Sequence, residues 1–128
     1  MLLDTSTVVE IFRNPAGSAV LEGITVRMED EEAFISIIQV AEVADWAERN
    51  KAPAEARVDA LKELARIVPI DQRICLDAAK IKRARRKEGF DSFGLIDGVI
   101  LATARSIGQR VLTFDEDFKG EEDCILLS

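Results

Sequence analysis

The sequence contains no histidine and no tyrosine among its 128 residues. Without imidazole, a Ser-His-Asp triad, a Cys-His pair, a histidine-ligated zinc site and a histidine general base are all excluded. The only two cysteines, Cys75 and Cys124, lie far apart, and we interpret them as two buried free thiols rather than as metal ligands. Any chemistry must therefore come from carboxylates, lysines, hydroxyls or a bound ion.

Long apolar runs, internal repeats and low-complexity tracts are also absent. No apolar segment has the length of a membrane span, and the N-terminus lacks the basic and apolar regions of a signal peptide. The length of 128 residues and the hydrophobic content of 48% predict a single domain over residues 1–128 with one real core. We therefore expect a cytoplasmic protein that makes no contact with a membrane.

Positive charge is in deficit, because 24 acidic residues face 17 basic ones and the formal net charge is −7. This balance argues against general coating of nucleic acid, although it leaves room for a local basic strip. One such strip is present, since six basic residues fall within positions 80–87: Lys80, Lys82, Arg83, Arg85, Arg86 and Lys87.

Two interpretations of this strip remain open. Lys82 and Arg86 share one helix face, as do Arg83 and Lys87, and these four are candidates to contact an RNA backbone. Alternatively, the strip is a solvated helix end whose positive charge complements the helix dipole. Phosphate binding would be favoured if the strip flanked a catalytic cleft.

Short apolar segments alternate with helical patterns along the chain. Strands are predicted at residues 1–3, 33–38, 68–70, 111–114 and 124–127. Helices are predicted to begin near Thr7, Ser36, Pro53, Asp71 and Ser92, with the third running towards Ile67 and the last two ending at Gly89 and Gly108. Because the strands are apolar on both faces, the pattern predicts an α/β protein with a mainly parallel sheet sandwiched between helices.

Four acidic residues fall near the carboxyl ends of these predicted strands, where such folds form their sites. Asp4 ends the first strand, Asp115 follows the fourth, and Glu42 and Asp97 lie close to the starts of their helices. Asp97 stands in the segment Leu-Ile-Asp-Gly-Val-Ile-Leu-Ala, which holds no other charge. Each acid alone could be a cap or an exposed residue, but a carboxylate in apolar surroundings needs compensation, either from distant cations or from a shared metal ion.

Carboxylate oxygens without imidazole or thiolate suit a hard cation, Mg²⁺ or Mn²⁺. Phosphodiester hydrolysis is the natural reaction for such a cluster. A rival enzyme would be a phosphatase that uses Asp4 as nucleophile, but Ser6 stands where a second aspartate is expected. A phosphorylated receiver domain would need a late lysine after a strand, and none fits well.

Four segments then resemble, in order, the conserved blocks of PIN-domain nucleases, and most of all the VapC-type toxins of toxin–antitoxin pairs. They are Leu-Leu-Asp-Thr-Ser-Thr, Ile-Ser-Ile-Ile-Gln-Val-Ala-Glu, Leu-Ile-Asp-Gly-Val-Ile-Leu-Ala-Thr-Ala and Val-Leu-Thr-Phe-Asp-Glu-Asp-Phe. The resemblance spans Met1 to Phe118. It implies an α/β/α sandwich, Mg²⁺- or Mn²⁺-dependent cleavage of RNA, a homodimer and inhibition by an antitoxin protein.

Residue by residue, the resemblance places the catalytic and metal-binding acids at Asp4, Glu42, Asp97 and Asp115. It also assigns supporting positions to Thr5, Ser6, Thr113 and Asp117. A non-catalytic PIN-like module that binds RNA or protein is the alternative from another functional class.

Gly94 and Gly98 have the spacing of a close helix contact. Gly98 stands where the family usually has alanine, which we expect to loosen its helix.

Overall fold

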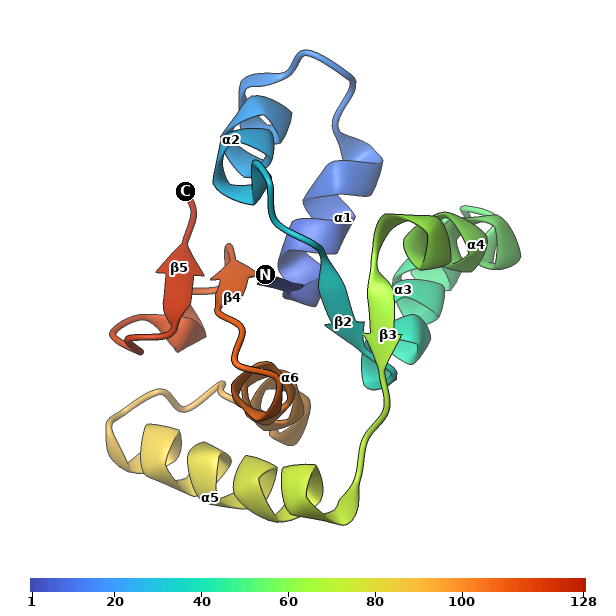
Figure 1. Cartoon of the computed structure of the whole chain (residues 1–128). Coiled ribbons are helices and arrows are strands. Elements are labelled where there is room, and N and C mark those ends of the chain that lie inside the picture. The colour runs from blue at the N-terminus through green and yellow to red at the C-terminus, as the bar shows by residue number, and fades with distance from the viewer.

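The computed structural model describes all 128 residues as a parallel sheet with helices on both faces (Figure 1). The five strands lie in the order β3-β2-β1-β4-β5, and every neighbouring pair is parallel. The predicted α/β/α sandwich is therefore confirmed. The strands are β1 (Leu2–Leu3), β2 (Phe34–Ser36), β3 (Arg66–Val68), β4 (Val111–Thr113) and β5 (Cys124–Leu126). The helices are α1 (Thr5–Arg13), α2 (Ala19–Met28), α3 (Ile38–Arg49), α4 (Ala54–Leu64), α5 (Gln72–Lys87), α6 (Leu95–Ser106) and the 3₁₀ turn η1 (Glu116–Phe118).

Alternation along the strands divides the core between the two faces of the sheet. Leu3 packs in a cluster with Val8 of α1 and Val43 of α3, whereas its neighbour Leu2 packs with Leu101 of α6. Successive side chains of a strand point to opposite faces of the sheet. When helices cover both faces, the side chains on each face must therefore be apolar. This is why the strands read as continuous apolar runs rather than as alternating ones.

The strand order places a topological switch beside β1. The chain runs from β1 outward to β2 and β3, then returns through α5 and α6 to β4 on the other side of β1. Connections leave β1 and β4 in opposite directions, and parallel α/β folds hold their ligands beyond the carboxyl ends of strands at such a switch. Asp4 follows β1 directly, and Asp115 lies two residues beyond β4.

Helix α5 packs on α6 and not on the sheet, as Figure 1 shows at the bottom of the view. Ile74 and Ala78 of α5 form a small apolar cluster with Ala102 of α6. At Gly98 the two helices are so close that an added Cβ would lie 2.5 Å from the carbonyl oxygen of Ala78. Gly98 therefore permits tight packing of α5 on α6, while its expected loosening effect on α6 stays a prediction. Gly94 has no such contact with α5.

Several sequence-based boundaries were wrong. The helix expected to start at Thr7 begins at Thr5, because Thr7 is buried and donates its hydroxyl hydrogen to the carbonyl of Leu112 at 2.7 Å instead of capping. Ser92 does not cap α6, whose N-cap is Gly94. Helix α4 ends at Leu64, so Ile67 belongs to β3, which lies two residues earlier than predicted. Asp71 does cap α5, accepting from the Ile74 amide at 2.8 Å.

The two cysteines are free but not both buried. Cys75 is exposed, in contrast to the prediction, and Cys124 is partly buried. Burial raises the pKa of the Cys124 thiol to about 12, which keeps it protonated. None of the helices combines the length and the apolar composition that a membrane crossing requires.

The contact at Gly98 can be tested with a matched glycine in another helix. Gly98→Ala should lower the free energy of unfolding by about 1–3 kcal/mol, since the new methyl group must displace the backbone of α5. Gly23→Ala in α2, where nothing lies within 4 Å of the added Cβ, should instead stabilise the protein by up to about 1 kcal/mol. Urea denaturation measures both; a stable Gly98→Ala variant would contradict the close approach.

Candidate functional site

Asp4 is the most deeply buried acid of the predicted set, with 3% of its surface exposed. Its Oδ2 atom accepts hydrogen bonds from the hydroxyls of Ser6 and Thr113, both at 2.7 Å. Burial raises the pKa of the Asp4 carboxyl, and these two hydroxyl donors oppose that rise. The nearby charge of Asp115 raises it further.

The two hydroxyls that bind Asp4 also receive hydrogen bonds from the chain beyond β4. Ser6 Oγ accepts from the amide of Phe114 at 3.0 Å, and Thr113 Oγ1 accepts from the amide of Asp115 at 2.9 Å. Each hydroxyl therefore links the Asp4 carboxylate to one backbone N–H. As a result, the segment that carries Asp115 is fixed to the end of β1.

Glu42 lies in α3 and accepts a hydrogen bond from the Thr5 hydroxyl at 2.6 Å. Gln39, one turn earlier, is fully buried and donates to the carbonyl of Leu3 at 2.6 Å while accepting from the Ser36 amide. Burial raises the pKa of Glu42, the Thr5 hydroxyl lowers it, and the charge of Asp4 raises it again. Thr5 thus joins Glu42 to the end of β1, as Ser6 does for Phe114, the residue before Asp115.

Asp97 occupies the third position of α6 and accepts the amide hydrogen of Gly94 at 2.8 Å. Asp97 therefore helps to cap the N-terminus of α6, as the third residue of a capping box does. Burial raises the pKa of the Asp97 carboxyl from 3.8 to about 7, against the effect of the Gly94 amide. The charges of Asp4, Asp115 and Glu42 contribute to this rise, so the four predicted acids share one electrostatic environment.

The closest grouping of acids is Asp97, Asp115 and Asp117, each of which offers a carboxylate oxygen within 4.8 Å of the others. Asp115 caps η1 by accepting the Asp117 amide at 2.9 Å, and Asp117 accepts the Ser92 hydroxyl at 3.0 Å. The structure thus places Asp117, predicted only as a supporting residue, beside Asp97 and Asp115. Asp4 and Glu42 lie outside this trio.

The donor set of this trio fits a hard divalent cation. Three carboxylates without imidazole or thiolate are the ligands that Mg²⁺ and Mn²⁺ prefer. No lysine or arginine forms an ion pair with any of the three. No basic side chain therefore offsets the repulsion among these carboxylates, and a bound cation would do so.

The sequence analysis did not predict a structural role for Arg85, because this residue stands within a run of basic residues that we expected to be exposed. Its side chain is only 2% exposed and donates to the backbone carbonyls of Asp117 and Lys119. It pairs with Glu121 at 3.3 Å, and its guanidinium carbon lies 3.7 Å from the centre of the Phe90 ring. Arg85 therefore holds the loop that carries Asp117 against α5 through these hydrogen bonds.

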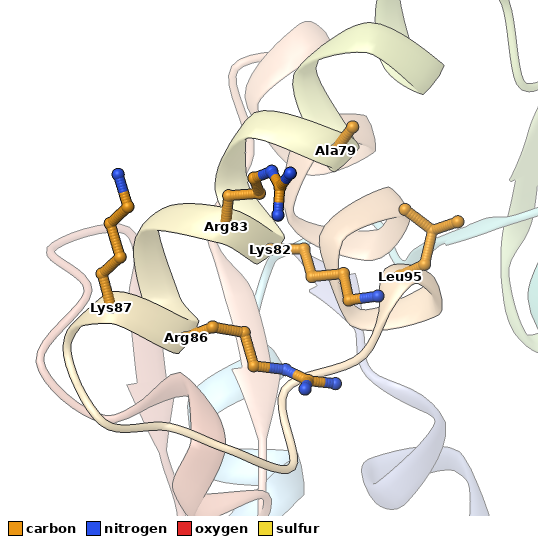
Figure 2. A pocket seen from close by; sticks show the side chains of 6 residues that line it. All are labelled: Ala79, Lys82, Arg83, Arg86, Lys87 and Leu95. Carbon is orange, nitrogen blue, oxygen red and sulfur yellow. The ribbon is translucent and has the colours of Figure 1, made fainter.

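The remaining basic residues of the strip behave differently. Lys82, Arg83, Arg86 and Lys87 line one cavity of about 840 Å³ together with Leu95, the first residue of α6 (Figure 2). These are the four residues predicted to contact RNA.

Comparison with known proteins identifies the family. A sequence profile described as PIN domain matches residues 1–120. The chain belongs to the PIN-domain family. A search of curated protein sequences finds no match.

Solved structures share the fold of this PIN domain along nearly its whole length. A toxin–antitoxin complex from Klebsiella pneumoniae superposes with a TM-score of 0.74 at 22% identity, covering 97% of this chain and 94% of the other. FitAcB from Neisseria gonorrhoeae gives a TM-score of 0.68 at 25% identity over 98% and 96% of the two chains. VapC20 of Mycobacterium tuberculosis, described as a sarcin–ricin loop cleaving toxin, gives 0.72 at 19% identity over 95% of each chain.

Arg85 should contribute strongly to the stability of this PIN domain. Arg85→Met removes the donors to two loop carbonyls and should lower the free energy of unfolding by about 2–4 kcal/mol. Arg83→Met, at an exposed position two residues earlier, should change it by less than about 0.5 kcal/mol. Chemical denaturation compares the two variants, and equal effects would mean that Arg85 is not the fastening residue.

The raised pKa of Asp97 predicts a stability change that depends on pH. Since the folded-state pKa lies above the unfolded one, ionising Asp97 destabilises the metal-free fold, and stability falls as the pH rises from about 4 to about 7. Asp97→Asn keeps an acceptor for the Gly94 amide but removes the charge. Its melting temperature in EDTA should exceed that of the wild type at pH 8, and this gain should shrink towards pH 4.

Asp59→Asn, at an exposed position of α4, is the matched control and should show no such trend. A constant difference between Asp97→Asn and the wild type across this pH range would contradict the raised pKa.

Proposed function

We propose that this PIN domain is an endoribonuclease that needs Mg²⁺ or Mn²⁺ and hydrolyses RNA phosphodiester bonds. The observation that supports this most directly is the approach of Asp97, Asp115 and Asp117 at the switch between β1 and β4. Asp4 and Glu42 complete the acidic environment. Membership of a nuclease family agrees with this chemistry.

The residues of the site divide into two groups in this proposal. Asp97, Asp115 and Asp117 would hold the cation, which when bound neutralises phosphate charge and makes an attacking water more acidic. Asp4 and Glu42, the other two predicted metal ligands, are also proposed to face this cation, since their charges act on Asp97. Asp4 acts through Ser6 and Thr113, which position the backbone before Asp115. Glu42 acts with Thr5 on the other side of β1. Each side chain is therefore held by a hydrogen bond before substrate arrives, as preorganised catalysis requires.

A phosphatase with Asp4 as its nucleophile is disfavoured by the burial of that residue. A nucleophilic carboxylate must reach the phosphorus atom, whereas Asp4 is 3% exposed and its Oδ2 accepts two hydroxyl hydrogens. A non-catalytic PIN-like module remains the alternative function. The presence of all four predicted acids weighs against it.

A role as the toxin of a toxin–antitoxin pair is part of the proposal. The similar structures include a toxin–antitoxin complex from Klebsiella pneumoniae and VapBC-1 from nontypeable Haemophilus influenzae. VapC20, which cleaves the sarcin–ricin loop according to its description, supports RNA as the substrate. We accordingly propose an antitoxin partner, a homodimer and action in the cytoplasm.

Metal-dependent cleavage is the decisive test. The purified protein should cut end-labelled RNA in Mn²⁺ or Mg²⁺ and stop when EDTA is added. Asp97→Asn should reduce the rate by about 100-fold or more, because it removes one carboxylate from the cation site. It should also weaken Mn²⁺ binding measured by calorimetry.

Asp59→Asn carries the same chemical change outside the site and should retain the wild-type rate. Mn²⁺ binding without cleavage of any RNA, alone or after removal of a bound partner, would favour the non-catalytic module. Cleavage that persists in Asp97→Asn would contradict the assignment of this site.

A further inference from the structure

A basic groove runs between α5 and the start of α6, and Figure 2 shows it from close by. Its volume is about 840 Å³, and no carboxylate lines it. Lys82 and Arg86 extend towards Leu95 in this view, whereas Lys87 points away. The basic groove is lined by Ala79, Lys82, Arg83, Arg86, Lys87 and Leu95.

The four cations of the basic groove are not neutralised by the chain. None of them forms an ion pair with a carboxylate, whereas Arg49, Arg73 and Arg105 each have an acidic partner within 3.3 Å. The net charge of the chain is −7, so four unpaired cations on one groove give this region a charge opposite to that of the whole chain. Such a reversal is the electrostatic footprint of a polyanion site.

The basic groove is connected to the acidic trio through the loop before α6. Arg86 Nε donates to the carbonyl of Phe93 at 2.6 Å, and the amide of the next residue, Gly94, donates to Asp97 Oδ2 at 2.8 Å. Leu95 lines the groove two residues before Asp97. The start of α6 therefore presents one side to the cations and carries a member of the acidic trio.

The spacing of the cations suits a single nucleic acid strand. Lys82 and Arg86 are one helical turn apart, as are Arg83 and Lys87, which places each pair about 6 Å apart along the axis. Consecutive phosphates of an extended strand have a similar separation. Leu95 is 51% exposed at the groove, and its side chain offers an apolar surface to a ribose or a base.

We propose that the basic groove binds the phosphodiester backbone of single-stranded RNA and leads the strand to the acidic trio. This inference rests on the proposed nuclease function for the position of the scissile bond, but not for the binding itself. Lys82 and Arg83 contact phosphates directly. Arg86 has a second task, because its bond to Phe93 also holds the loop before Asp97.

The test replaces two groove cations that have no structural bond. The Lys82→Gln/Arg83→Gln double variant is compared with Arg27→Gln/Lys62→Gln, which makes the same charge change at exposed positions of α2 and α4. The affinity for a short fluorescent single-stranded RNA is measured by anisotropy in EDTA at several salt concentrations. Working in EDTA separates binding from cleavage.

The groove variant should bind RNA about tenfold more weakly, and its slope of log K against log salt should fall by about 1.4, since each lost phosphate contact contributes about 0.7. The control should stay within about twofold of the wild type, because distant surface charges are screened. In Mn²⁺ the groove variant should show a raised KM with kcat retained. Sedimentation of both variants reports any change in assembly.

Equal losses in the two double variants, or no loss in the groove variant, would overturn the proposal. So would a groove variant that keeps its RNA affinity but changes its oligomeric state, because the groove would then be a protein interface. A third outcome is RNA binding that depends on Lys82 and Arg83 but is followed by no cleavage. This outcome would support the proposed RNA-binding groove and contradict the proposed nuclease function. The two failures are therefore distinguishable.

Discussion

The buried carboxylate of Asp4 is the constraint on which the rest of the site depends. Moving a charge from water to the end of a central strand costs several kcal/mol unless hydrogen bonds replace its hydration. Ser6 and Thr113 supply two of these bonds, and both hydroxyls in turn accept backbone amides of the segment 114–115. Stabilising the charge therefore requires β1 and β4 to end side by side in one register.

The same arrangement brings several carboxylates close together, and their mutual repulsion lowers the stability of the fold. Asp97 is partly desolvated and lies near Asp4, Glu42, Asp115 and Asp117, and burial is the largest cause that raises its pKa to about 7. The apolar packing around α6, including the contact at Gly98, holds it there against that repulsion. A cation at the trio would convert this repulsion into binding free energy, because ligands already held in place lose little freedom on binding. Preorganisation by the core would thus favour the proposed metal binding at the expense of stability without the metal.

Local signals in the sequence predicted the parts of the structure that depend on local interactions. Asp71 at the start of α5 and Gly89 after its end follow from capping and backbone rules, and Gly89 indeed has a φ of 100°. Asp4 and Asp97 stood out because a lone charge in an apolar segment is costly wherever it is placed. Arg85 could not be found this way, since its partners Glu121, Asp117 and Lys119 lie more than thirty residues away. The role of Asp117 depends on that same loop, which explains why the sequence ranked it as secondary.

The separation of the two charge signs has a physical reason in the proposed arrangement. A chain of net charge −7 repels RNA at long range, so the proposed binding must rely on cations within about 8–10 Å of the phosphates, because salt largely screens charges at greater distances. Placing those cations inside the acidic trio would pair them with its carboxylates and cancel the metal site. Placing them on α5, beside the first turn of α6, keeps both charges available. In this arrangement an RNA strand would be attracted to the basic groove alone. Repulsion from the acidic surface elsewhere would restrict the positions that the RNA can occupy.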